Sequence, residues 1–369
     1  MRRILSKLVR ECKRIMRYRH NRAFFDGYFK EIIKANHIKE IGINSPAYKE
    51  WKKKWSVFGN APSPYGWQAF SDCMKEDVRF VPNDIARNFI EPVLTPSEFQ
   101  PFYNDKNSLG MILDSRWLPK TFLRSMNGRL YDGNYLAVDK NSLYDLFKET
   151  NKLVVKPAKD MGGKGVTLFC RKGDIFTDDK GNVLSLNFLE KNYGTDYLVQ
   201  ECLKQSSFMS QFNKTSVNTL RIATYRDVNT GEIKVLGCVI RIGGKGSFVD
   251  NACSGGSFIN VDKDGRLGKF ACNTHGEKSE IYNDIDFSKS DFVVPDFDKI
   301  KSFVCEVANR MPHMSLFAND VAIDEEGTPR LIEVNTMMFS YWLYQFNGVP
   351  VFGDDTDDVI NYCLKQSRN

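Results

Sequence analysis

The alternation of apolar and polar residues is clearest near the C-terminus, in the segments FANDVAID and PRLIEVNT between Phe317 and Thr336. Alternation with a period of two predicts two β-strands, and the acidic turn Glu325–Gly327 between them predicts a hairpin. If the strands pair through this turn, Asp320, Glu333 and Asn335 can converge, because side chains two residues apart share a face. Two carboxylates and an amide oxygen are ligands that suit Mg²⁺. A hairpin whose acids merely face water is the alternative.

A second pair of strand-like segments, LVVK and GVTLFC, flanks a glycine-rich loop between Leu153 and Cys170. Gly162, Gly163 and Gly165 would let successive backbone N–H groups approach phosphate oxygens, and Lys164 would add positive charge. The loop lacks the spacing of a Walker loop, and a strand rather than a helix follows it. The sequence therefore predicts a phosphate-binding loop, with an ordinary glycine hairpin and a solvated lysine as the alternative.

Two arginines interrupt the otherwise apolar strands SVNTLRIATYR and EIKVLGCVIRIGG, which an Asn-Thr-Gly turn joins. An arginine in an apolar strand is costly unless an anion or an acid meets it. Arg221 and Arg241 are therefore candidates to bind a phosphate or a carboxylate. Ion pairs with Asp250 or Asp320 are the structural alternative, and the sequence leaves the two open.

The first 22 residues combine strong positive charge with apolar residues at helical spacing. Nine arginines and lysines stand against a single acid, Glu11. The recurring apolar positions are Ile4, Leu5, Leu8, Cys12, Ile15 and Met16. This pattern predicts a basic amphipathic helix. We expect its apolar positions to pack on its own domain, with contact to an anionic membrane surface as the alternative. No nucleic-acid-binding motif accompanies the charge, so we expect no nucleic-acid partner.

The composition, with 42% hydrophobic and 27% charged residues, is that of a soluble globular protein, and the 369 residues predict two or three domains. No apolar run approaches the length of a membrane span, and no secretory signal is visible. Nine cysteines without a C-x-x-C pair indicate reduced thiols, and four histidines without ligand spacing disfavour a zinc site. We therefore expect a cytoplasmic protein, with peripheral attachment at the inner face of the membrane if the basic helix binds lipid.

In chain order, the sequence shows a lysine in LPKTF, a strand lysine, the glycine-rich loop, a Gln-Glu pair ending an apolar strand, a strand arginine and the acidic hairpin. This order resembles the ATP-grasp superfamily, specifically its sugar-transfer-associated branch in bacterial polysaccharide biosynthesis. The metal motif matches in residue type and spacing, with twelve residues between Asp320 and Glu333 and one between Glu333 and Asn335. Each motif is weak alone, and their joint order from about residue 117 to residue 339 is specific.

The resemblance implies a fold and a division of the chain. The fold is α+β, an ATP-grasp fold in which two α+β subdomains grip ATP, preceded here by a mixed N-terminal domain. We expect an N-terminal helical and mixed region with the basic helix over residues 1–110. A lid subdomain would then occupy residues 111–200, and a catalytic subdomain residues 201–369.

The resemblance also implies roles for single residues. The ATP-phosphate lysines would be Lys120 and Lys156, the lid Gly162, Gly163, Lys164 and Gly165, the adenine-side hinge Gln200, Glu201 and Leu203, and the Mg²⁺ ligands Asp320, Glu333 and Asn335. Many relatives carry an arginine two residues before the metal aspartate, where this chain has Ala318. Catalysis on the transferred phosphate would therefore fall to Arg221, Arg241 and Lys156.

The implied function is an ATP-dependent carboxylate–amine ligase that forms an amide through an acyl-phosphate, with Mg²⁺ as cofactor. Its substrates would be ATP, a carboxylate and an amine. We expect it to join an amino acid and a sugar in the biosynthesis of a surface polysaccharide such as capsule or O-antigen. A kinase that phosphorylates a sugar hydroxyl and a non-catalytic ATP-binding scaffold are the alternatives.

Overall fold

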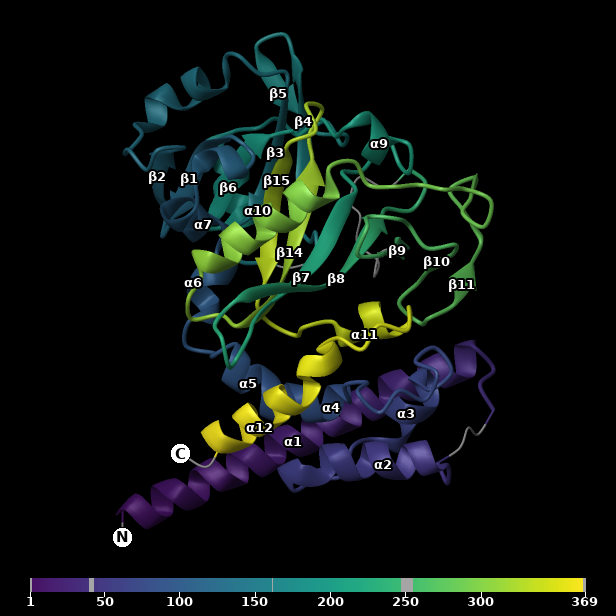
Figure 1. The fold of residues 1–369 in the computed structure, drawn as a ribbon. Coiled ribbons are helices and arrows are strands. Elements are labelled where there is room, and N and C mark those ends of the chain that lie inside the picture. The colour runs from purple at the N-terminus through teal and green to yellow at the C-terminus, as the bar shows by residue number, and fades with distance from the viewer. Residues whose placement is uncertain (1, 40–42, 161, 247–254, 368–369) are drawn as a thin grey trace.

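The structure, a computed structural model, describes residues 2–39, 43–160, 162–246 and 255–367, without the side chains of residues 2–11, 141 and 142. Two antiparallel sheets of six and seven strands form the upper part of the molecule in Figure 1, and a layer of helices lies below the larger sheet. Asp250, one of the two acids considered for Arg221 and Arg241, lies outside the described residues.

Helices occupy most of the first 112 residues. They are α1 (Arg2–Ala35), α2 (Pro46–Trp55), α3 (Pro64–Phe70), α4 (Asn83–Ile85), α5 (Glu91–Leu94), α6 (Gln100–Asn104) and α7 (Lys106–Ile112), with a π-helical turn over Ala86–Ile90. The predicted basic helix is present, but it continues past residue 22 to Ala35. Along its C-terminal half, apolar residues remain at helical spacing and pack into the core, which keeps the helix going.

The apolar stripe of α1 does not pack in the way that the sequence predicted. Phe29 and Ile32 are buried, whereas Cys12, Ile15 and Met16 are exposed. The expected contact of Cys12 and Ile15 with the N-terminal domain is therefore wrong. The core contact starts at about Tyr18, and the helix before this residue projects past the body of the protein (Figure 1).

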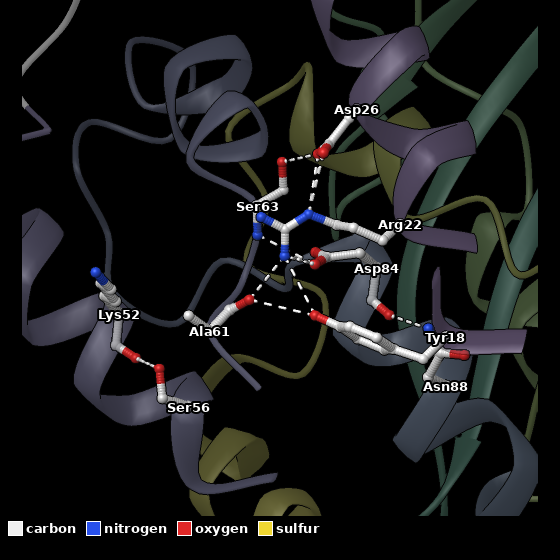
Figure 2. Close-up of polar contacts among 9 residues, drawn as sticks. All are labelled: Tyr18, Arg22, Asp26, Lys52, Ser56, Ala61, Ser63, Asp84 and Asn88. Atoms are coloured by element: carbon white, nitrogen blue, oxygen red, sulfur yellow. Dashed lines mark hydrogen bonds and ion pairs between the residues drawn. The ribbon is translucent and has the colours of Figure 1, made fainter. Parts of the chain in front are cut away.

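A cluster of polar contacts fixes α1 to the neighbouring helices where the projection ends (Figure 2). Arg22 donates hydrogen bonds to Asp84 at 3.0 Å, to Asp26 at 3.1 Å and to the carbonyl oxygen of Ala61 at 2.7 Å. Asp84 is fully buried and also accepts from the backbone N–H of Ser63 at 3.1 Å. Burial raises the pKa of Asp84 to about 6, although the charge of Arg22 opposes this shift.

The smaller sheet has the strand order β2-β1-β6-β3-β4-β5. Its strands are β1 (Thr121–Met126), β2 (Arg129–Asp132), β3 (Lys152–Pro157), β4 (Thr167–Lys172), β5 (Ile175–Thr177) and β6 (Tyr197–Glu201). One face is covered by a 3₁₀ segment (Lys140–Phe147) and α8 (Leu186–Tyr193), which bury Phe147 and Leu189 with Phe169 and Tyr197. β3 and β4 flank the glycine-rich loop, as predicted.

The larger sheet has the strand order β11-β10-β9-β8-β7-β14-β15. Its strands are β7 (Thr219–Arg226), β8 (Ile233–Ile242), β9 (Ser257–Val261), β10 (Ala271–Cys272), β11 (Lys278–Ser279), β14 (Leu316–Ile323) and β15 (Pro329–Asn335). A separate short hairpin pairs β12 (Ile281–Tyr282) with β13 (Ile285–Asp286). The remaining helices are α9 (Ser207–Ser210), α10 (Phe297–Asn309), α11 (Tyr341–Gln345) and α12 (Thr356–Gln366).

Both faces of the larger sheet are buried. On one face, the apolar stripe of α10, including Ile300 and Val304, packs on residues such as Ile222. On the other face, the N-terminal helices share one core with α11 and α12, so the first and last helices of the chain lie side by side (Figure 1). The boundaries expected at residues 110 and 200 stay predictions. Among the helices described, none combines the length and the apolar character that crossing a bilayer requires.

Candidate functional site

The acidic hairpin forms as predicted from β14 and β15. Asp320 lies directly opposite Glu333, and Ala318 lies opposite Asn335. The amide nitrogen of Asn335 donates to Asp320 at 3.2 Å, so the structure brings the three predicted metal ligands together. Asp324 faces a different environment, where it accepts from the backbone N–H of Thr328 at 2.8 Å and closes the turn.

The two strand arginines both meet Asp320. β7 pairs with β14 so that Arg221 lies opposite Asp320, and β8 lies on the far side of β7. Arg221 donates through Nε at 2.7 Å and through Nη2 at 2.6 Å, and Arg241 donates through Nη1 at 2.8 Å. Both arginines therefore form the ion pair with Asp320 that the sequence left open, and the pairing with Asp250 falls outside the described residues.

This cluster holds Asp320 in its charged form. Burial alone would raise the pKa of Asp320, which is only 2% exposed. The charges of Arg221 and Arg241 outweigh this effect and hold the pKa well below its usual range. Burial similarly opposes the charge on Arg221, yet Asp320 raises the pKa of that guanidinium above its ordinary value. The pair is thus ionised near neutral pH.

Two lysines from segments that precede the hairpin in the chain face it. Lys156, on β3, is 8% exposed, and burial together with the charge of Lys106 lowers its pKa to about 7. Lys106 is the first residue of α7, and its Nζ lies 3.1 Å from Glu333 and donates to the carbonyl of Asp160 at 2.8 Å. The site therefore carries a lysine pair on one side and a carboxylate pair on the other.

Sequence reasoning did not consider Lys106 and assigned a phosphate-binding role to Lys120, which stays a prediction. The backbone N–H of Lys120 donates to the predicted hinge residue Glu201 at 2.7 Å, whereas its exposed side chain lies over the ring of Phe122, with Nζ 5.1 Å from the ring centre. Lys106 follows Asp105, whose side chain accepts from the backbone N–H of Asn107 at 2.9 Å and caps α7. This capping signal could have placed Lys106 at a helix start, but not beside the hairpin.

The three glycines of the loop between β3 and β4 take a conformation that other residues rarely adopt. Gly162, Gly163 and Gly165 have φ values of +72°, +71° and +72°, in the left-handed region that favours glycine. A side chain at Gly165 would also meet Pro157, whose Cγ would lie 2.9 Å from the new Cβ. Gly163 and Lys164 reach the cavity described next.

A cavity of about 150 Å³ lies between the two sheets and collects most of the predicted residues. Its polar side chains include those of Lys106, Lys156, Lys164, Arg241, Asp320 and Glu333. Val154, Val166, Leu203 and Ile332 form apolar walls, and Gln200 and Glu201 line it where β6 ends. The cavity thus has an apolar part beside β6 and a charged part beside the hairpin.

Most of the sequence matches the model of a known protein family. The family model described as sugar-transfer associated ATP-grasp matches residues 86–356. The chain belongs to this family. The resemblance read from the sequence and the expected ATP-grasp fold are thereby confirmed. The match begins at the π-helical turn and leaves α1 to α4 outside it.

Other comparisons give only distant likenesses. D-alanine–D-alanine ligase from Bacillus anthracis aligns at 14% identity and TM-score 0.37, over 72% of this chain and 69% of that one. L-amino acid ligase from Bacillus licheniformis aligns at 16% identity and TM-score 0.36, over 71% of this chain and 48% of that one. The ATP-grasp ligase PsnB with its minimal precursor aligns at 12% identity and TM-score 0.37, over 87% of this chain and 76% of that one. A search of curated proteins finds no match.

The oxygen atoms of the hairpin fit a magnesium ion of an ATP-grasp protein. Oδ2 of Asp320 accepts from Arg221, Arg241 and Asn335, whereas Oδ1 accepts only from Arg221 among the contacts recorded for the described residues. A carboxylate offers about four lone-pair positions, so Oδ1 keeps one acceptor position. No described group of three or more His, Cys, Asp or Glu residues could form a metal cage. The donors instead fit Mg²⁺ held by one or two carboxylates together with substrate phosphates.

Proposed function

We propose that this ATP-grasp protein binds ATP in the cavity between its two sheets and uses it to activate a carboxylate for attack by an amine. The observation that carries the proposal is the placement of Lys106 and Lys156 against the hairpin residues Asp320 and Glu333 in one cavity. A cavity with cations on one side and metal-binding oxygens on the other suits a polyphosphate bound with a metal ion.

Each end of the nucleotide would meet a matching part of the cavity. The apolar side chains near Gln200 and Leu203 suit a flat purine ring, and the hinge backbone beside Glu201 supplies hydrogen-bonding groups. Lys156 and Lys106 would bind the phosphates, and Lys106 takes the role that the sequence gave to Lys120. The loop of Gly162, Gly163, Lys164 and Gly165 would close over the terminal phosphates with its backbone N–H groups.

The chemistry requires charge neutralisation more than a covalent nucleophile. A carboxylate oxygen of the acceptor attacks the γ-phosphorus, the bond to the β-phosphate oxygen breaks, and ADP leaves. The amine then attacks the acyl carbon, phosphate departs, and the nitrogen loses a proton to the surrounding water. Arg221 and Arg241 would stabilise the negative oxygens of these steps from the position in which Asp320 orients them.

Mg²⁺ fits this scheme as a ligand of the hairpin. Glu333, Asn335 and the open position on Oδ1 of Asp320 would hold it. When bound, it supplies a positive charge that draws electrons from the transferred phosphoryl group. Glu333 would have to loosen its contact with Lys106, which would free the lysine for a phosphate oxygen.

For the substrates, we propose that the acid and the amine are an amino acid and a sugar of a surface polysaccharide. The support is the family's description as sugar-transfer associated. The test is to incubate the protein with ATP, Mg²⁺, hydroxylamine and panels of amino acids and sugar acids. An acyl-phosphate yields a hydroxamate in the presence of hydroxylamine, and ADP release should depend on the acid.

Two outcomes would replace the ligase proposal. ADP release that depends on a sugar and yields a phosphosugar without any hydroxamate would favour the kinase. Nucleotide binding without turnover, across both panels and added amines, would favour the scaffold. Glu333→Gln serves as the control, since true turnover should fall with it while a contaminating ATPase would persist.

We also propose that the projecting part of α1 contacts an anionic membrane surface. Lys13 and Arg17 are exposed there beside the exposed apolar side chains Ile15 and Met16. Each cation near such a surface contributes about 1 kcal/mol. Removing residues 1–16, which spares Tyr18 and Arg22 in the anchoring cluster, should abolish salt-sensitive sedimentation with anionic liposomes and leave the melting temperature unchanged. Equal sedimentation of both chains would contradict it.

A further inference from the structure

We propose that Arg124 and Lys120 form a second binding site, for a small molecule that carries a carboxylate or a phosphate. The site occupies a cavity of about 690 Å³ beside β1, next to the nucleotide cavity. The two cavities share Pro119 and Glu201 at the hinge. The inference stands on the geometry of this second cavity and does not rest on the ligase activity proposed above.

Arg124 is a buried charge that forms no direct ion pair with a described residue, although Asp105 and Asp132 act on its charge from a distance. It is 3% exposed, and it lies on the same face of the sheet as Lys156, because both are opposite Leu198 on β6. Its guanidinium lies 4.5 Å from the ring centre of Tyr135. Within the described part of the chain, Nε and Nη1 have no hydrogen-bond partner and no ion pair forms.

Such an arrangement is costly without an anion. Burial lowers the pKa of Arg124, which reflects the missing solvation of its charge. A buried guanidinium is normally paired with a carboxylate or phosphate, and a contact with an aromatic ring replaces only part of that interaction. Nε and Nη1 are themselves closed to solvent, so an anion in the cavity would meet the part of Arg124 that lines it and would compensate the unpaired charge.

The cavity offers a second cation and has mostly committed acids. Lys120 lines it with an exposed side chain that forms no ion pair with any described residue. Of the acids around the cavity, Asp132 accepts from two backbone N–H groups, Asp145 pairs with Lys148, and Glu201 accepts from the backbone N–H of Lys120. Glu149 lies exposed at the rim.

The size and the walls of the cavity indicate the kind of ligand. Its volume falls within the range of about 300–1,000 Å³ that is usual for small-molecule pockets. Phe122 and Leu118 give it an apolar wall beside the two cations. A compact organic acid or a phosphorylated small molecule therefore fits better than a free inorganic ion, although inorganic ions can probe the charged end.

The test uses the full chain saturated with MgADP, which still leaves the positions of the γ-phosphate and of the acceptor open, so binding at the second cavity is identified by its loss in Arg124→Met and Lys120→Met. Inorganic phosphate and acetate are titrated separately by calorimetry and thermal denaturation in a Tris chloride buffer. One or both should bind and raise the melting temperature, and the two arms distinguish a phosphate site from a carboxylate site. Arg124→Met should weaken this binding by at least about tenfold, because a charged hydrogen bond is lost.

Arg124→Met should also melt higher than the wild type in buffer without phosphate or acetate, because an unpaired buried charge has been removed. A purely structural arginine predicts the reverse, with a lower melting temperature and an unchanged response to both anions. Lys120→Met provides a surface variant that should fold normally and still lose affinity several-fold. No response of the wild type to either anion, or unchanged affinity in Lys120→Met, would overturn the proposal.

Discussion

Asp320→Asn should destabilise the protein far more than Glu333→Gln, although both changes remove one negative charge from the same hairpin. Asp320 is 2% exposed and receives three hydrogen bonds from Arg221 and Arg241. Asparagine keeps one acceptor oxygen and turns an NH₂ group toward guanidinium donors. Breaking a buried ion pair by removing one partner costs about 3–5 kcal/mol, because the remaining charge is left unpaired.

Glu333 is in a milder position. Its side chain is 17% exposed and meets Lys106, which keeps its hydrogen bond to the carbonyl of Asp160 after the substitution. Glu333→Gln should therefore cost about 1–2 kcal/mol. Its effect on turnover should be larger, a fall of roughly 10²–10³, because a ligand of the metal ion is lost.

Urea denaturation of both variants checks this difference. With a slope of about 3 kcal/mol/M, Asp320→Asn should lower the midpoint by about 1 M or more, and Glu333→Gln by less than about 0.7 M. Asp324→Asn is the matched control, since Asp324 holds the turn and Arg330 but not the cavity cations, and its turnover should be near that of the wild type. Equal midpoints for Asp320→Asn and the wild type would refute the buried ion cluster.

Three further predictions follow from the buried charges. Because the pKa of Lys156 is about 7 in the free protein, this lysine should gain up to about 0.9 proton per site when MgADP binds at pH 8, and far less at pH 6. Calorimetry in buffers of different ionisation enthalpy measures the proton uptake. Lys156→Met should abolish this uptake. In the same titration, Lys106→Met should weaken MgADP binding by at least about tenfold, and Lys120→Met should not weaken it. Weaker binding by Lys120→Met with unchanged binding by Lys106→Met would show that Lys120 is the lysine that binds phosphate. Arg22→Met should lower the free energy of unfolding by about 3–5 kcal/mol, because Asp84 is left without its partner. Adding Asp84→Leu to this variant should recover much of the lost stability. No recovery would show that the loss comes from the contacts of Arg22 rather than from the unpaired charge.

The parts of the site that were predictable from the sequence are those with a local signal. The hairpin of Asp320 and Glu333 has alternation and a turn, so its register follows from period two. The loop around Gly163 has glycines at positions where φ is positive. In both cases, neighbouring residues carry the information, and no distant strand has to be placed.

The parts that were missed depend on contacts between distant segments. Lys106 reaches the cavity because its backbone N–H binds the carbonyl of Ala158, which places the start of α7 beside the glycine-rich loop. The pairing of Arg221 with Asp320 spans 99 residues and requires β7 to lie next to β14. Neither contact leaves a pattern in the sequence, so period and spacing could not decide between Lys106 and Lys120, or between an acid and a phosphate for Arg221.

The charges of the cavity suggest why the pKa of Lys156 lies near neutral pH. At the hairpin, Arg221, Arg241 and Lys106 against Asp320 and Glu333 leave a net charge of about +1 while Lys156 is neutral and about +2 once it is protonated. Lys164, Asp160 and Glu201, which also line the cavity, lower both totals by one. ATP with one magnesium ion carries about two negative charges near neutral pH. A protonated Lys156 would thus bring the charge of the cavity closer to that needed to balance the ligand, and without ligand the same proton adds a cation to a buried site. Above pH 7, Lys156 would become charged mainly as the nucleotide arrives, so affinity should fall with rising pH as the proton becomes harder to obtain.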